Sequence, residues 1–147
     1  MRVIAGKARR LNLKTVPGMD TRPTTDRIKE TLFNILQPEL LDCHFLDLFS
    51  GSGAIGIEAL SRGAAKAVFV DNSKEALSCI RQNLEKTHLA DRAIVIGQDC
   101  AGAIHALDAK KMHFDIIFMD PPYQLNAEKE VLTAIADSKI ADEDTQI

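Results

Sequence analysis

The chain has 147 residues, of which 46% are hydrophobic and 27% charged, the mix expected of one globular domain. This composition excludes a disordered tail, a fibrous repeat and a low-complexity linker, and no apolar run approaches the ~20 residues of a membrane helix. The net charge of −3 is uneven, because residues 1–30 carry +5 and the remainder −8. A basic arm on an acidic body suits a polyanionic partner, although a solvated basic hairpin is the simpler interpretation of a charge run alone.

Cysteine usage and the first residues indicate the compartment. Cys43, Cys79 and Cys100 are scattered, and no C-x-x-C pair occurs. We therefore expect neither a disulfide framework nor a metal site. The first seven residues hold too few apolar side chains for a secretory signal peptide. A reducing, cytoplasmic location without a membrane partner is the simplest expectation.

The N-terminal part predicts short extended segments followed by a helix. Residues 2–16 are typical of one or two short strands with a polar break, closed by the Pro-Gly turn pair at 17–18. Residues 22–25 are predicted to form an extended lead into a helix. The apolar residues at helical spacing in that helix are Ile28, Leu32, Ile35 and Leu36. Pro38 is expected to end the helix.

A regular alternation of strands and helices follows. The predicted strands cover 45–49, 67–71, 93–96 and 114–119. The helix after the first strand is predicted to run to Arg62, with Gly63 as its C-cap. The next helix covers 73–88, with Asn72 and Glu75 as a capping pair, and two more helices cover 101–110 and 127–136. Nearly continuous apolar strands between helices indicate a Rossmann-like α/β fold, a parallel sheet in the order 3-2-1-4 with helices on both faces. We expect residues 1–21 to form a basic arm and residues 22–147 a domain whose last strands lie beyond residue 147, because a bare apolar edge strand would aggregate.

A glycine loop follows the first predicted strand. Gly51, Gly53 and Gly56 match the G-x-G-x-x-G spacing, and Asp71 ends the next strand, as in a dinucleotide site. Asp47, just ahead of the glycines, favours S-adenosylmethionine instead, since a carboxylate attracts the ammonium of methionine and repels a pyrophosphate. Asp71 could accept hydrogen bonds from ribose hydroxyls. Asp99, which follows the third strand, could accept one from the adenine amino group.

A second motif, Asp120-Pro121-Pro122-Tyr123, follows the fourth predicted strand. Ligands of open parallel sheets bind at the carboxyl ends of the strands, so this motif should face the same crevice as the glycine loop. The prolines stiffen the turn and remove amide donors. What remains is a fixed pair of acceptors, the Asp120 carboxylate and the Pro121 carbonyl, beside the aromatic ring of Tyr123. This set fits the planar exocyclic amine of a nucleobase.

These motifs resemble those of the class I amino-methyltransferases. The stretch Arg22-Pro-Thr-Thr-Asp26-Arg27-Ile-Lys-Glu-Thr-Leu-Phe33 is similar to the signature of the RsmD family, the bacterial 16S rRNA guanine-N2 methyltransferases. The resemblance implies the class I methyltransferase fold and methyl transfer from S-adenosylmethionine to a guanine of small-subunit rRNA, free or within an assembling subunit. The expected cofactor-binding residues are Asp47, Gly51, Ser52, Gly53, Asp71, Asn72 and Asp99. The expected catalytic residues are Asp120, Pro121, Pro122 and Tyr123, and the expected RNA-binding residues are Arg9, Arg10, Arg22, Pro23 and Thr24.

Three other functions stay open at this stage. An adenine-N6 methyltransferase shares the P-P-Y grip, but the chain has no room for a separate DNA-recognition domain. An NAD-type oxidoreductase rests on the glycine fingerprint and leaves the D-P-P-Y motif unexplained. A non-catalytic RNA-binding module is the third alternative.

Overall fold

The structure, a computed structural model, describes residues 2–16, 26–120 and 127–147. Within these residues, four parallel strands form one sheet in the order β3-β2-β1-β4, as the sequence predicted. The strands are β1 (His44–Leu48), β2 (Lys66–Asp71), β3 (Ala93–Gly97) and β4 (Ile116–Met119). The helices are α1 (Asp26–Leu40), α2 (Ala54–Ser61), α3 (Lys74–Thr87), α4 (Cys100–Ala109) and α5 (Ala127–Ala136), with a short 3-10 turn, η1 (Ala90–Arg92).

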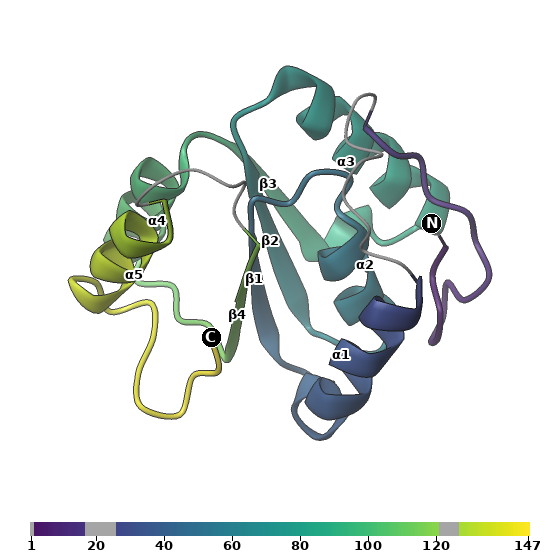
Figure 1. Ribbon diagram of the computed structural model, residues 1–147, viewed down its shortest axis with the longest axis horizontal. Coiled ribbons are helices and arrows are strands. Elements are labelled where there is room, and N and C mark those ends of the chain that lie inside the picture. The colour runs from purple at the N-terminus through teal and green to yellow at the C-terminus, as the bar shows by residue number, and fades with distance from the viewer. Residues whose placement is uncertain (1, 17–25, 121–126) are drawn as a thin grey trace.

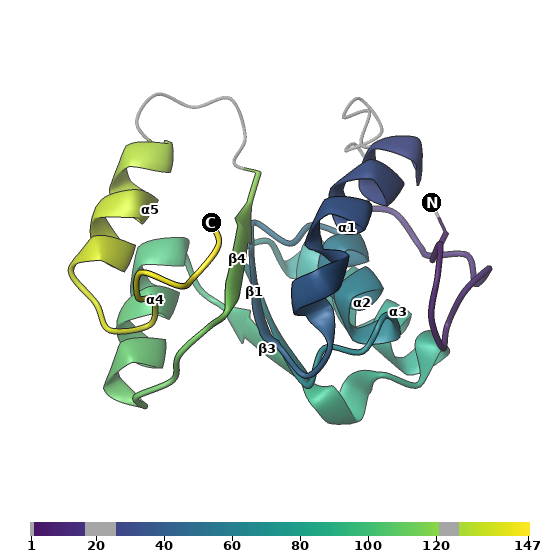
Figure 2. The same ribbon diagram turned by 90° about the horizontal axis from the view of Figure 1, so that it is seen from below.

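The sheet lies between two layers of helices, with α1, α2 and α3 on one face and α4 and α5 on the other (Figure 1, Figure 2). Successive strand residues point to opposite faces, so each strand serves two cores. Phe45 and Phe69 join the cluster under α1, α2 and α3. Leu46 and Val68 join the cluster under α4 and α5. This burial on both faces explains why the strands are almost entirely apolar.

Helix α1 continues past the predicted stop at Pro38 and ends at Leu40. A proline in the last turn removes one backbone hydrogen bond, to the carbonyl four residues earlier. Leu40 is fully buried in the core under α1, α2 and α3, and its burial favours the extra turn. The prediction that Pro38 ends the helix was therefore wrong by two residues.

The α2 helix ends at Ser61 with Arg62 as its C-cap, one residue earlier than predicted, and Gly63 follows the cap. Gly63 has φ +117°, a left-handed conformation that suits glycine, and Ala64 donates its N–H to the Ala59 carbonyl at 3.0 Å. This pattern is a Schellman motif, in which a left-handed residue just past the helix satisfies the last carbonyls.

The N-terminal segment, residues 2–16, contains no regular strand, contrary to the prediction. A single antiparallel bridge joins Arg2 to Asn12, and Val3 exchanges hydrogen bonds with Leu11 and Arg10 at 2.9 and 2.8 Å. Val3, Ala8 and Leu13 are buried in the cluster under α1, α2 and α3. The segment, drawn in purple, runs along the outside of α2 and α3 (Figure 2). We call residues 2–13 the arm, and its packing fixes it against the body of the protein.

The outer edge of β4 meets the last described residues. Gln146 forms a parallel bridge with Ile116, and its carbonyl accepts the Ile117 N–H at 2.7 Å. Its side chain also donates to Glu39 at the end of α1, at 3.0 Å. Backbone pairing therefore continues beyond β4 at these residues.

Candidate active site

Asp47 lies at the centre of the carboxyl edge of the sheet. It is the fourth residue of β1 and only 1% exposed. One carboxylate oxygen accepts the N–H of Gly56, in the first turn of α2, at 3.1 Å. Burial raises the pKa of Asp47 to about 7, and the nearby carboxylates of Asp71 and Asp120 add to this rise, whereas hydrogen bonds from Gly56 and Ser50 oppose it. A cationic ligand beside Asp47 would therefore favour its ionised form.

Ser50 fixes the start of the loop between β1 and α2. The Ser50 hydroxyl donates to the Asp47 carbonyl at 2.6 Å and accepts the Val70 N–H at 3.1 Å, so it ties the end of β1 to β2. Gly51 and Gly53 have φ +59° and +82°, left-handed conformations that glycine adopts without strain. Ser52 lies between them and is half-buried.

Gly56 serves packing. A Cβ at this position would lie 2.4 Å from the Phe69 ring, so only glycine lets α2 approach β2 this closely. Its N–H still helps to hold Asp47. The third glycine of the motif is therefore explained by helix–strand contact, as is usual for this fingerprint.

Asp71, the last residue of β2, closes the same loop. One oxygen accepts the Gly51 N–H and the other the Ser73 N–H, both at 2.9 Å. Each carboxylate oxygen has a second lone-pair position, so further acceptance from a ligand hydroxyl is possible. Asn72 follows and is exposed. The predicted capping role of Asn72 was wrong, because the Ser73 side chain caps α3 by accepting the Ala76 N–H at 3.3 Å.

Asp99 follows β3 and is the N-cap of α4. One oxygen accepts the Gly102 N–H at 2.9 Å, and the residue is exposed. The cap uses one carboxylate oxygen, and the second oxygen can accept from a ligand amine. Its expected contact with adenine stays a prediction.

Asp120 comes directly after β4. Leu48 of β1 pairs with Met119 of β4, so Asp120 lies one position beyond the paired residues. The residue is exposed, and its charge contributes to the raised pKa of Asp47. Of the other expected site residues, Pro121, Pro122, Tyr123, Arg22, Pro23 and Thr24 lie outside the described residues.

The carboxyl edge of the sheet is thus acidic at the end of every strand. Asp47, Asp71, Asp99 and Asp120 belong to or follow β1, β2, β3 and β4 respectively. Such a set attracts a cation and repels a pyrophosphate. The residues present therefore fit S-adenosylmethionine, which carries an ammonium and a sulfonium, better than a dinucleotide.

The arm displays its cations on a turn. Arg9 and Arg10 are exposed, and Arg10 has φ +72°, an uncommon conformation for an arginine. Hydrogen bonds from Arg9 to the Gly6 carbonyl at 3.2 Å and from Arg10 to the Val3 carbonyl at 2.8 Å hold the turn. The two arginines therefore project from an ordered backbone.

The cysteines and the other side chains that can ligate a metal do not cluster into a site in the part of the chain that the structure describes. No group of three or more histidine, cysteine or acidic side chains there could hold a metal ion. All three cysteines are free and buried, and burial raises the pKa of Cys43 to about 12 and that of Cys100 to about 11. These thiols are poor nucleophiles. No described helix is long and apolar enough to cross a membrane.

Sequence reasoning missed two residues of this region. Ser50 ties β1 to β2 beneath the loop, and Glu58 of α2 is a fully buried carboxylate. A signal for Glu58 was present, since it interrupts an otherwise apolar helix sequence, Ala54–Leu60. A charge inside a buried helix requires partners, but the sequence does not say which.

Comparison with known proteins identifies the relatives of this chain. A family model described as "Conserved hypothetical protein 95" matches residues 1–147. The protein YlbH of Bacillus subtilis is 42% identical over 144 residues, which cover 98% of this chain and 78% of that protein. The "Ribosomal RNA small subunit methyltransferase D" of Escherichia coli K12 is 38% identical over 146 residues, 97% of this chain and 71% of that protein.

A solved structure shows the same architecture. That of the protein yhhF from Escherichia coli superposes with a TM-score of 0.84 and 32% identity, covering 97% of this chain and 75% of that one. The parallel sheet and these likenesses point to one family. The chain belongs to the RsmD family of S-adenosylmethionine-dependent methyltransferases.

Proposed function

We propose that this protein transfers a methyl group from S-adenosylmethionine to the exocyclic N2 amine of a guanine in small-subunit rRNA. The observation that carries the proposal is the position of Asp120, one residue beyond the register of β1 and close enough to Asp47 to raise its pKa. Asp120, which would bind the target amine, thus lies near Asp47, which would bind the cationic cofactor. Relatives that are named small-subunit rRNA methyltransferases supply the substrate class.

The cofactor would be held along the ends of β1, β2 and β3. When bound, S-adenosylmethionine supplies an electrophilic methyl group carried on a sulfonium sulfur. Asp47 would attract its ammonium, and Asp71 would accept hydrogen bonds from its ribose hydroxyls, with Asn72 beside it. Asp99 would accept one from its adenine amino group. The remaining contacts would come from the loop residues Gly51, Ser52 and Gly53.

The D-P-P-Y motif would hold the target base. A guanine amine is a poor nucleophile because its lone pair is delocalised into the ring. The Asp120 carboxylate and the Pro121 carbonyl would accept the two amine hydrogens, which orients the nitrogen and favours a more tetrahedral form. Asp120 can then take up the proton that the amine releases. Tyr123 would stack on the base, worth ~1–3 kcal/mol by analogy with single-strand binders. Pro122 would stiffen the turn.

The RNA would be met by the arm and the lead into α1. Arg9 and Arg10 would contact phosphates, and Arg22, Pro23 and Thr24 would border the crevice. The positive charge of the arm would bind the RNA phosphates, and the negative charge at the carboxyl edge of the sheet would bind the cationic cofactor. The N-terminal segment, residues 1–21, which includes the arm, and the methyltransferase domain, residues 22–147, are the corresponding proposed units.

Identification of the methylated nucleoside tests the proposal. The protein would be incubated with labelled S-adenosylmethionine and undermethylated small ribosomal subunits, and the digested RNA analysed by mass spectrometry. We expect label in N2-methylguanosine. Label in N6-methyladenosine would keep the mechanism and replace the substrate, whereas no label despite cofactor binding would favour a binding module.

A further inference from the structure

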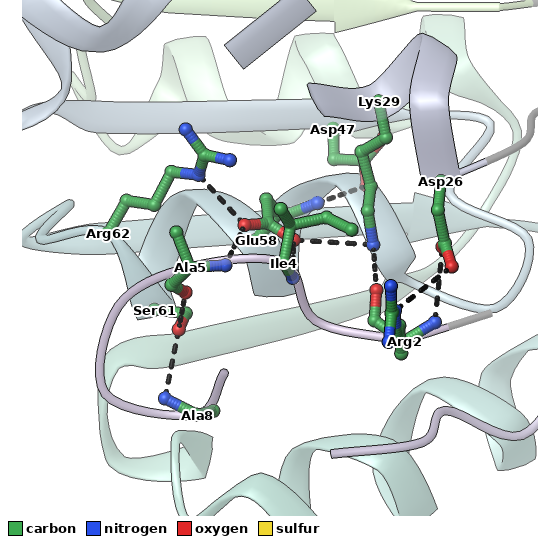
Figure 3. Close-up of polar contacts among 11 residues, drawn as sticks. Arg2, Ile4, Ala5, Ala8, Asp26, Lys29, Asp47, Glu58, Ser61 and Arg62 are labelled. Carbon is green, nitrogen blue, oxygen red and sulfur yellow. Dashed lines mark hydrogen bonds and ion pairs between the residues drawn. The ribbon is translucent and has the colours of Figure 1, made fainter. Parts of the chain in front are cut away.

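The carboxylate of Glu58 is the centre of a buried polar cluster that joins the arm, α1 and α2 (Figure 3). Two arm amides donate to it, that of Ile4 at 2.9 Å and that of Ala5 at 3.1 Å. Two cationic side chains complete the set, Lys29 Nζ at 3.3 Å and Arg62 Nε at 2.8 Å. A carboxylate has about four lone-pair positions, so this one is fully used within the protein.

Lys29 extends the cluster to the start of the arm. Its ammonium is fully buried and also donates to the Arg2 carbonyl at 2.6 Å. Asp26 accepts from the Arg2 backbone N–H at 3.3 Å and forms an ion pair with the Arg2 side chain at 3.5 Å. Burial lowers the pKa of Lys29, and the charge of Glu58 counteracts this effect. The first turn of α1 therefore clamps the first described residues of the arm.

One turn after Glu58, Ser61 fastens the turn of the arm. Its hydroxyl donates to the Ala5 carbonyl at 2.6 Å and accepts the Ala8 N–H at 2.9 Å. Its own carbonyl accepts the Lys7 N–H at 2.9 Å. A Cβ at Gly6, which has φ +85°, would lie 1.8 Å from that carbonyl oxygen. Glycine is therefore required there, and the arm touches α2 backbone to backbone.

The same helix leads directly from the loop assigned to the cofactor. Gly56, two residues before Glu58, donates its N–H to Asp47. The C-terminal part of α2 thus binds the arm, and its first turn binds Asp47 at the acidic edge of the sheet. Burying charges rarely adds stability compared with an apolar cluster of the same shape, and a defined geometry is the better-attested gain.

We propose that Glu58 is a positioning residue for RNA binding. It fixes the turn of the arm on α2, so that Arg9 and Arg10 meet the phosphates as a preformed pair. Preorganisation lowers the entropy that is lost on binding. This inference rests on the proposed function only in that the arm faces RNA.

A double-mutant cycle tests it, with small ribosomal subunits as the RNA probe. Glu58→Gln should weaken binding about tenfold when the arm is intact. In a chain that also carries Arg9→Ala and Arg10→Ala, the same change should weaken binding less than about twofold, because its effect passes through those arginines. The affinity for S-adenosylhomocysteine should stay within about twofold throughout. Glu85→Gln, which alters an exposed carboxylate on α3, is the matched control.

Two further variants keep the test decisive if Glu58→Gln alone does not fold. Lys29→Met with Glu58→Gln removes both buried charges together, and Ser61→Ala loosens only the contacts to Ala5 and Ala8. Circular dichroism and urea unfolding would confirm that the chains compared are folded. We expect both variants to lose RNA affinity when Arg9 and Arg10 are present and to lose little when the two arginines are replaced by alanine.

Three results would overturn the inference. The first is that Glu58→Gln lowers RNA affinity equally with and without Arg9 and Arg10. The second is that Glu58→Gln lowers the affinity for S-adenosylhomocysteine as much as the affinity for RNA. The third is that RNA binding does not change when Arg9 and Arg10 are replaced. Methyl transfer to an atom other than guanine N2 would refute the proposed function alone and leave this cycle intact.

Discussion

Replacing Asp47 by asparagine should strengthen the fold and weaken cofactor binding, each in a defined pH range. Burial raises the pKa of this carboxyl from 3.8 to about 7. If only the ionised form attracts the ammonium of the cofactor, affinity falls about tenfold for each pH unit below 7. The dissociation constant of the wild-type complex should therefore rise roughly 100-fold from pH 8 to pH 5. In Asp47→Asn the affinity should be low and the pH slope absent.

The same raised pKa has the opposite consequence for stability. A carboxyl that resists ionisation in the folded state favours folding below about pH 4, and that contribution is lost as the pH rises through 7. The shift of about three units corresponds to an upper bound of roughly 4 kcal/mol at pH 8. Asparagine keeps the acceptor for the Gly56 N–H and cannot ionise. Asp47→Asn should therefore raise the free energy of unfolding at pH 8 and change it little at pH 4.

The assay is calorimetric titration with S-adenosylhomocysteine between pH 5 and pH 8, with urea unfolding in the same buffers. This ligand has the ammonium and lacks the sulfonium, so it isolates the contact in question. Asp91→Asn, an exposed carboxylate in η1 at the opposite end of β3, serves as the control. A flat wild-type dissociation constant over this range, or the same slope in both proteins, would refute the assignment of Asp47.

Three further outcomes follow from the site and the fold. Tyr123→Ala should lower the methylation rate roughly 5- to 150-fold, the equivalent of ~1–3 kcal/mol of stacking, with little change in cofactor affinity; an equal loss of both would contradict the stacking role. Arg9→Ala with Arg10→Ala should reduce the slope of log affinity against log salt concentration by about one for each phosphate that is no longer neutralised, measured by filter binding, and an unchanged slope would return these arginines to a solvated surface. Gly56→Ala should lower the free energy of unfolding by about 1–3 kcal/mol, measured in urea, because the new Cβ meets the Phe69 ring; unchanged stability would show that α2 can move away from β2.

The spacing of apolar residues and glycines predicted most of the fold, because the strands and the loop depend on residues close together in sequence. Burial on two faces explains the apolar strands and their order, and the glycine spacing with Asp47 and Asp71 located the loop between β1 and α2. The stop at Pro38 was misplaced because the burial of Leu40, a tertiary effect, extends the helix.

The partners of the polar groups could not be predicted in the same way. Glu58 meets the amide of Ile4, 54 residues away in sequence, and no local pattern encodes that contact. The cap of α3 was assigned to Asn72, one residue early, because asparagine and serine are about equally good caps and only the backbone conformation decides between them. Long-range contacts of this kind also convert the arm from a basic tail into an ordered surface.

The roles assigned to the acidic edge are tested most directly by a side-by-side measurement on Asp120→Asn. Asparagine keeps the size of the side chain and one acceptor but cannot take up a proton. We predict that S-adenosylhomocysteine binds within about threefold of wild type while formation of N2-methylguanosine falls by about 100-fold or more. Methylation at the wild-type rate, or loss of cofactor binding to the same extent as loss of methylation, would contradict the separate roles of the carboxylates at the ends of β1 and β4.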